Sequence, residues 1–202
     1  MAKRTTKGTT PADMLEGGRL EKEGKYHLFV KSVADMQKIN GDAGEGFTVE
    51  LQALAGDHAD QTDRTIKLFI ADPSPSHKDH GAFCAKRQCA FLLAANAIGI
   101  ESLNGSDVEF DAEECAGHQV IAKLANKKKQ NPTDPDYLDF SGLEIYHVDD
   151  PRAAAVVKNP DAIGAIPQQF RRKADYFAPL LKNDGKPASK TSAKSEANFD
   201  DL

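Results

Sequence analysis

The sequence predicts an all-β domain with one helix, in which five strands close into a small barrel. Two observations predict this class. Five segments have the period-two alternation or the β-branched and aromatic content of strands, and one longer segment has helical spacing between the third and fourth of them. The sequence contains no internal repeat, which argues against a solenoid. The elements are therefore expected in the order of three strands, one helix and two strands.

The first three strands are expected at residues 24–33, 47–54 and 64–70. The first is rich in aromatic and β-branched residues, and the other two alternate apolar with polar side chains. Turn-forming residues, rich in Gly and Asp, separate each strand from the next. Three sequential strands of this kind predict a meander.

A helix is expected at residues 80–98, after the helix-breaking segment 72–76 and before Gly99. Two further strands are expected at residues 118–124 and 138–148, around a long loop that contains Pro132 and Pro135. This element order is that of the OB-fold. The two longest polar connections, residues 37–46 and 125–136, fall where OB-folds keep the loops that flank one binding groove.

Composition limits the other possibilities. The chain has 202 residues, a net charge of -5, three Cys and no Trp. Its mean hydropathy is -0.53, and it contains no apolar run of the roughly 20 residues that a membrane-spanning helix needs. We therefore expect one domain in a reducing cytoplasm, without disulfides and without membrane contact, and we expect any polyanion to meet a local basic patch.

The chain is divided into four parts. Residues 1–20 are expected to form a flexible basic leader, residues 21–150 the OB-fold domain and residues 151–182 a C-terminal extension. Within the extension, Phe170, Ala174, Phe177 and Leu181 have the spacing of a short helix. Residues 183–202 are expected to be a disordered linker with an acidic, hydrophobic tip.

Several motifs between residues 24 and 148 carry a resemblance to a known family. They are Glu23-Gly-Lys-Tyr-His-Leu-Phe-Val, a Gly-rich loop before an alternating strand, Lys67-Leu-Phe-Ile70, and Lys86-Arg-Gln-Cys-Ala-Phe-Leu-Leu-Ala-Ala95 followed by Gly99-Ile. With these motifs the chain resembles the phage-encoded OB-fold proteins that bind single-stranded DNA, long catalogued as a family of unknown function. The resemblance implies work in DNA replication or recombination, in the host cytoplasm if the chain is phage encoded.

The end of the chain, Asn198-Phe-Asp-Asp-Leu202, is similar to the acidic tails with which single-stranded-DNA-binding proteins recruit partner enzymes. It lacks the usual Pro-Phe ending. The residues expected to bind a replication or recombination protein are Phe199, Asp200, Asp201 and Leu202.

A single DNA strand is bound by cations that meet phosphates and by flat rings that stack on bases. If Phe47 and the residues of the same parity face the core, the opposite parity places cations and rings on one outward face. The predicted DNA-binding residues are Phe29, Lys31, Lys67, Phe69, Lys123 and Tyr146 on the strands, with Lys127, Lys128 and Lys129 in the loop.

Other interpretations of these residues remain open. Curved barrel strands bury both parities, so Phe29 and Phe69 could be core side chains under the helix or the extension. Glu50 and Glu144 share the nominal outward face and would repel phosphate, and the lysine triplet could be a solvated loop. The rival function is then an OB-fold adaptor that binds only proteins.

A zinc site is the main rival chemistry. The candidate ligands match no zinc motif in their spacing, and the acidic groups at residues 107–114 and 134–139 fit a solvated surface better than a two-metal nuclease. We predict no metal, no cofactor and no catalysis, and the sequence leaves a homo-oligomer open. The ligands considered for zinc are His77, His80, Cys84, Cys89, Cys115 and His118.

Overall fold

The computed structural model describes residues 18–36, 46–73, 78–128 and 136–181. Most of the expected leader, the expected linker and tip, and Lys129 lie outside this described part. The same holds for Phe199, Asp200, Asp201 and Leu202.

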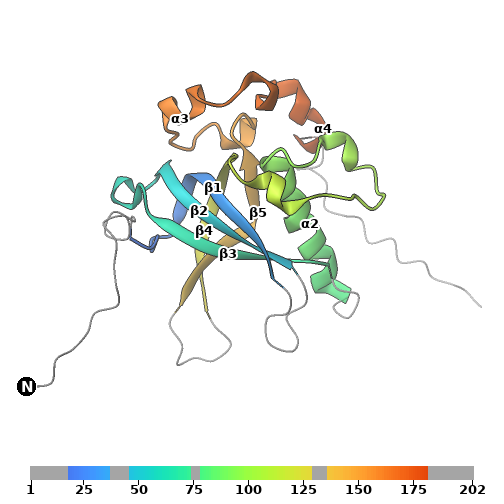
Figure 1. The fold of residues 1–202 in the computed structure, drawn as a ribbon, viewed down its shortest axis with the longest axis horizontal. Helices are drawn as coiled ribbons and strands as arrows, with labels where there is room; N and C mark the ends of the chain where they lie inside the picture. The colour runs from blue at the N-terminus through green and yellow to red at the C-terminus, as the bar shows by residue number, and fades with distance from the viewer. Residues whose placement is uncertain (1–17, 37–45, 74–77, 129–135, 182–202) are drawn as a thin grey trace, which may run out of the picture.

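The described strands form one antiparallel sheet of five strands (Figure 1). Their order in the sheet is β3-β2-β1-β4-β5, so the first strand lies in the middle between the second and the fourth. The strands are β1 Gly24–Met36, β2 Gly46–Gly56, β3 Thr65–Ala71, β4 Gln119–Lys127 and β5 Tyr137–His147. All five predicted strands are confirmed, with ends that differ by at most three residues.

The expected closure of the barrel is not observed. Within the described residues β3 and β5 are the two edges of the sheet and do not pair with each other. The start of β3 is instead covered by residues 18–20, where Leu20 N–H donates to Thr65 O at 2.8 Å and Thr65 N–H donates to Gly18 O at 3.1 Å. An open edge therefore remains between the rest of β3 and the start of β5.

The predicted long helix is α2, Lys78–Ala94. It ends four residues earlier than expected, because Asn96 rather than Gly99 takes the left-handed conformation, with φ of 60°. Phe91 of α2 inserts into the concave side of the sheet, with its ring centroid 6.2 Å from that of Phe47 and 6.0 Å from that of Phe140. Phe91 and the last residues of this helix join the strand side chains in one core.

The predicted inward parity is confirmed. The side chains of Tyr26, Leu28 and Val30 are fully buried, and the inward residues of the other four strands join them in one core. Burying each large apolar side chain contributes about 1.5–3 kcal/mol. The inward residues of the other strands are Phe47, Val49, Leu51, Ile66, Leu68, Ile70, Val120, Ala122, Leu124, Leu138, Phe140 and Ile145.

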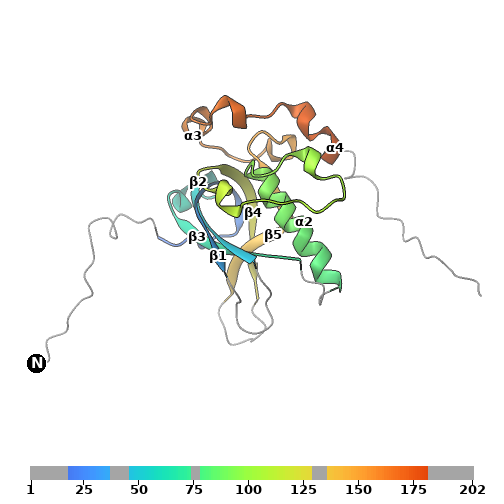
Figure 2. The same cartoon turned by 45° about the vertical axis from the view of Figure 1, so that its right-hand side comes forward.

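The C-terminal extension crosses one end of the sheet, as both views show in orange (Figures 1 and 2). It contains α3 Pro160–Gly164, α4 Ala178–Leu181 and several single turns of 3₁₀ helix. The short helix expected in the extension is replaced by these separate elements, and Phe170 and Phe177 belong to different turns of 3₁₀ helix. Pro167 and Pro179 lie in this segment, and because proline has no backbone N–H to donate within a helix, they favour short turns over one continuous helix.

Candidate functional site

The outward face of the sheet divides into two halves. The open half consists of Phe29 and Lys31 on β1, Glu50 on β2, and Lys67 and Phe69 on β3. The pairing of Thr48 with Phe69 and of Glu50 with Lys67 brings these strands into register. Phe29 and Phe69 are both partly exposed, and neither belongs to the two buried clusters of the described residues. Four predicted DNA-binding residues thus share one face.

The charge of the open half is set by one carboxylate between two ammonium groups. Glu50 Oε1 lies 3.4 Å from Lys31 Nζ, and Glu50 Oε2 lies 3.3 Å from Lys67 Nζ. Lys67 keeps 72% of its side chain exposed, so its ion pair contributes only about 0–1 kcal/mol. The three residues together carry one net positive charge, and an incoming phosphate would compete with Glu50 for both lysines.

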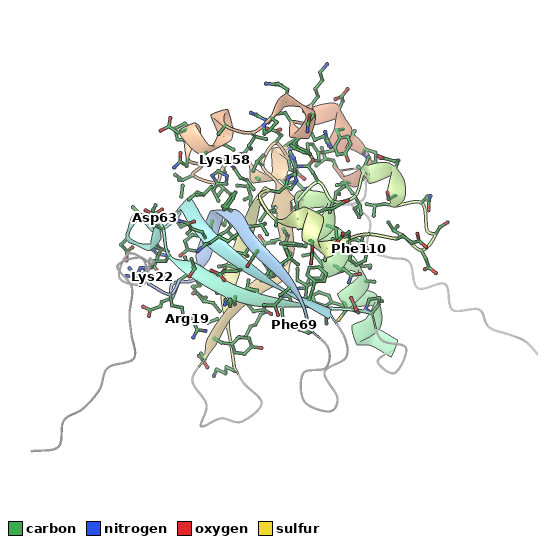
Figure 3. The ribbon with its side chains drawn as sticks, viewed as in Figure 1. Arg19, Lys22, Asp63, Phe69, Phe110 and Lys158 are labelled. Carbon is green, nitrogen blue, oxygen red and sulfur yellow. The ribbon has the colours of Figure 1, made fainter. Side chains whose placement is uncertain are left out.

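A cavity of about 330 Å³ occupies the open edge between β3 and β5. Its walls come from β3, the start of β5, the first turns of α2 and the segment that covers the start of β3. Figure 3 labels Arg19 and Phe69, which lie on the β3 side of this region. Three rings and three cations line it: Phe69, Phe83, Tyr137, Arg19, Lys67 and Arg87.

Arg87 connects the cavity to the core. Its guanidinium forms an ion pair with Asp139 and stacks over the ring of Phe140, 5.2 Å from the centroid. Its Nε is buried and donates no hydrogen bond to any described residue. A buried donor without a partner costs about 1–3 kcal/mol, and an oxygen acceptor in the cavity would recover this cost.

The ring of Phe69 lies against Gly46 at the start of β2. A Cβ atom on Gly46 would lie 2.7 Å from Phe69 Cζ and 2.3 Å from Ile70 O, distances too short for any other residue. The absence of a side chain at Gly46 therefore leaves room for the ring of Phe69, which also lines the cavity.

The predicted residues on β4 and β5 have different surroundings. Lys123 Nζ lies 3.1 Å from Glu144 Oε1. Tyr146 packs against the small cluster formed by Ile121 and the extension, and the guanidinium of Arg152 covers its ring, 4.8 Å from the centroid. The structure does not bring these two residues together with Phe29 and Phe69. Lys127 is half-buried at the end of β4, and Lys128 is exposed beyond it.

The other half of the outward face is covered by the extension. We call it the covered half, and its residues are His27, Gln119, Ile121 and Tyr146. Asn159 N–H donates to His27 Nδ1 at 3.2 Å, and Gln119 Nε2 donates to Ala162 O at 2.9 Å. Because Nδ1 accepts, the neutral ring carries its proton on Nε2, which donates to Gln119 Oε1 at 2.9 Å. Burial lowers the pKa of His27 to about 4.

Sequence reasoning missed four residues of the cavity: Arg19, Phe83, Arg87 and Tyr137. Arg19 falls in the expected leader, Phe83 and Arg87 fall in the expected helix, and Tyr137 precedes the expected strand. The spacing of Phe83 and Arg87, four residues apart at the start of a helix that follows an edge strand, is the signal that could have identified two of them.

The candidate zinc ligands are not brought together. The described part of the chain contains no group of three or more His, Cys, Asp or Glu that could hold a metal ion. Cys115 is buried, and its pKa is raised to about 12 by burial and by the nearby carboxylates of Glu114 and Asp111. His77 lies outside the described residues.

None of the described helices has the length and apolar content needed to cross a bilayer. Comparisons of the sequence with protein-family models and with curated proteins found no match.

Proposed function

We propose that this chain binds single-stranded DNA along the open half of the sheet, with the cavity at the open edge as the centre of the interface. The observation that carries the proposal is the meeting of three partly exposed rings with three cations at that edge. Rings supply stacking surfaces for bases of any sequence, and cations meet the phosphates between them.

The strand order supports the same proposal. The order β3-β2-β1-β4-β5, with the long helix between β3 and β4, is that of a five-stranded OB-fold opened between β3 and β5. OB-folds bind single strands on the outward face of their second and third strands. Glu50, Lys67 and Phe69 lie on that face here.

The rest of the proposal comes from the family resemblance. In this view the protein acts in phage DNA replication or recombination in the host cytoplasm. It protects exposed strands, and its tip, Phe199 to Leu202, recruits partner proteins.

The test is a titration of fluorescently labelled oligo-dT of several lengths at low and high salt. With three or four phosphate contacts, log Kd should change with log salt by a slope of magnitude about 2–3. Lys67→Gln should weaken binding and flatten this slope, whereas Lys123→Gln, which removes an ion-paired lysine on β4 outside the open half, should change neither. Absence of length-dependent binding would refute the proposal.

The rival function is a protein-interaction adaptor, and one observation favours it. Glu50 already pairs with two of the four predicted residues of the open half, which lowers the attraction for phosphate. An adaptor would show no salt-dependent affinity for oligo-dT, so the same titration separates the two functions.

A further inference from the structure

An apolar groove of about 610 Å³ runs along a different face of α2 from the one at the open edge. Its walls are α2, the loop of residues 102–108, β5 and the end of the extension. Leu103 and Leu143 line it and remain 41% and 40% exposed. Leu93 and Ala90 form its floor on the helix. Exposed apolar grooves of this size generally mark a place where another segment binds.

The described chain ends beside this groove. Leu180, in the last turn of the extension, is one of its lining residues, and the described part ends at Leu181. Of the 21 residues that follow, from 182 to 202, only Phe199 and Leu202 have large apolar side chains. The stretch of chain that begins at the rim of the groove therefore carries its large apolar side chains at its far end, in residues 198–202.

We propose that residues 198–202 of this chain bind in the groove along α2, with the ring of Phe199 between the helix and β5. Lys86 lines the groove and attracts the carboxylates of the tip, whereas Arg152, also in the lining, already forms an ion pair at 2.8 Å with Asp150, a carboxylate of the same groove. Asp107, in the loop that forms one wall, opposes this attraction. Burial of Phe199 and Leu202 therefore supplies most of the affinity.

The connection is long enough. Residues 182–197 are 16 residues that contain one Gly, three Ser, three Ala and four Lys. A random coil of 16 residues has a root-mean-square span of about 20–24 Å, and a tether with this span would give the tip an effective concentration of about a millimolar. A groove that would bind the tip of a separate molecule only weakly is then occupied most of the time by the tip of its own chain.

Binding of the tip in the groove withholds it from other proteins. A partner that takes the tip must first displace it from α2, so recruitment depends on competition between the groove and the partner. This inference does not depend on DNA binding, because the groove and the cavity at the open edge use different residues of α2.

Two cysteines on α2 provide the test. Cys89 lines the groove, whereas Cys84 lines the cavity at the open edge. Cleavage by trypsin after Lys86 and Arg87 separates them into different peptides. The rate of alkylation by iodoacetamide is measured for each thiol by mass spectrometry on the full chain. We expect Phe199→Ala to raise the rate at Cys89 at least threefold and to leave the rate at Cys84 unchanged.

Three controls make the result decisive. Leu103→Glu, at an exposed position of the groove, should remove the protection of Cys89 as Phe199→Ala does. A peptide of residues 198–202 at millimolar concentration should restore it in the Phe199→Ala protein. Equal Cys89 rates with and without Phe199 overturn the proposal. Protection that increases with protein concentration also overturns it, and assigns the groove to the tip of a second copy.

Discussion

The covered and open halves of the same sheet face satisfy their side chains in different ways. In the covered half the polar groups of the sheet hydrogen-bond to the extension, as His27 does with Asn159. Behind it Arg171 forms a bidentate pair with Asp149 at 2.7 and 2.8 Å. In the open half the two ion pairs of Glu50 are longer than 3.2 Å, and the rings stay partly exposed. The chain covers one half with its own residues and leaves the rings of the other half partly exposed.

The largest effect is expected where the extension is anchored. Phe177 is fully buried, its ring centroid lies 5.7 Å from that of His147, and its ring meets that of Tyr176 edge-on. Phe177→Ala should lower the free energy of unfolding by about 3–5 kcal/mol, because the cavity it leaves cannot collapse fully. Leu181→Ala, at a residue that is 39% exposed, should cost less than about 0.5 kcal/mol. Chemical denaturation of both variants measures the difference.

Hydrogen exchange on the Phe177→Ala protein then locates the loss. If the extension covers the sheet as an independent unit, the amides of residues 151–181 should exchange faster while those of β2 and β3 stay protected. Uniformly faster exchange would contradict the separation of the two halves.

The next effect concerns the open half. Phe69→Ala should weaken binding to oligo-dT by about 1–3 kcal/mol, because one stacked base loses its ring. Phe29→Ala removes a ring on the same face that does not line the cavity and should cost less. Fluorescence anisotropy gives both affinities, and circular dichroism checks that the variants are folded. An unchanged affinity for Phe69→Ala would remove this ring from the interface.

A pH dependence is expected from the covered half. The pKa of His27 falls from 6.5 to about 4 on folding, so the unfolded chain binds the proton more tightly. Stability contributed by the neutral ring is complete above pH 6.5 and is lost as the pH falls from there toward about 4. The pKa values of His147 and His118 are also lowered by burial and act in the same direction.

His27→Gln isolates this contribution. Between pH 8 and pH 5 the free energy of unfolding of the unaltered chain should fall by about 1–2 kcal/mol more than that of the variant, as measured by urea denaturation. The protonated ring can no longer accept the hydrogen bond of Asn159, so residues near α3 should lose protection first. Identical pH profiles for the two proteins would show that His27 does not titrate in this way.

The sequence predicts local structure well here and the site only in part. Alternation or β-branched and aromatic content identified every strand, and a period of two gave the outward parity of Phe29, Lys31, Lys67 and Phe69, because both are properties of one strand alone. Curvature depends on several strands at once. Register shifts occur in β1 and between Ala122 and Leu124, and among the described residues β3 and β5 do not pair. This opening brings residues from β3, β5 and α2 to one cavity.

Two further features could not be read from the sequence. Lys31 and Lys67 share Glu50 because the register of three strands places that carboxylate between them. Tyr146 has outward parity but lies under Arg152, because the extension folds back on β4 and β5. Both facts depend on contacts between residues far apart in the chain, which periodicity does not encode.

The smallest predicted effect has the opposite sign. Glu50→Gln keeps the shape of the side chain but removes the negative charge between Lys31 and Lys67. Binding to oligo-dT at low salt should become tighter by about 0.5–1 kcal/mol, and the salt dependence should steepen by about one phosphate contact. Glu144→Gln removes the matching charge beside Lys123 and should leave the affinity unchanged. Equal gains from both variants would mean that only overall charge matters, and that the open half has no special part in binding.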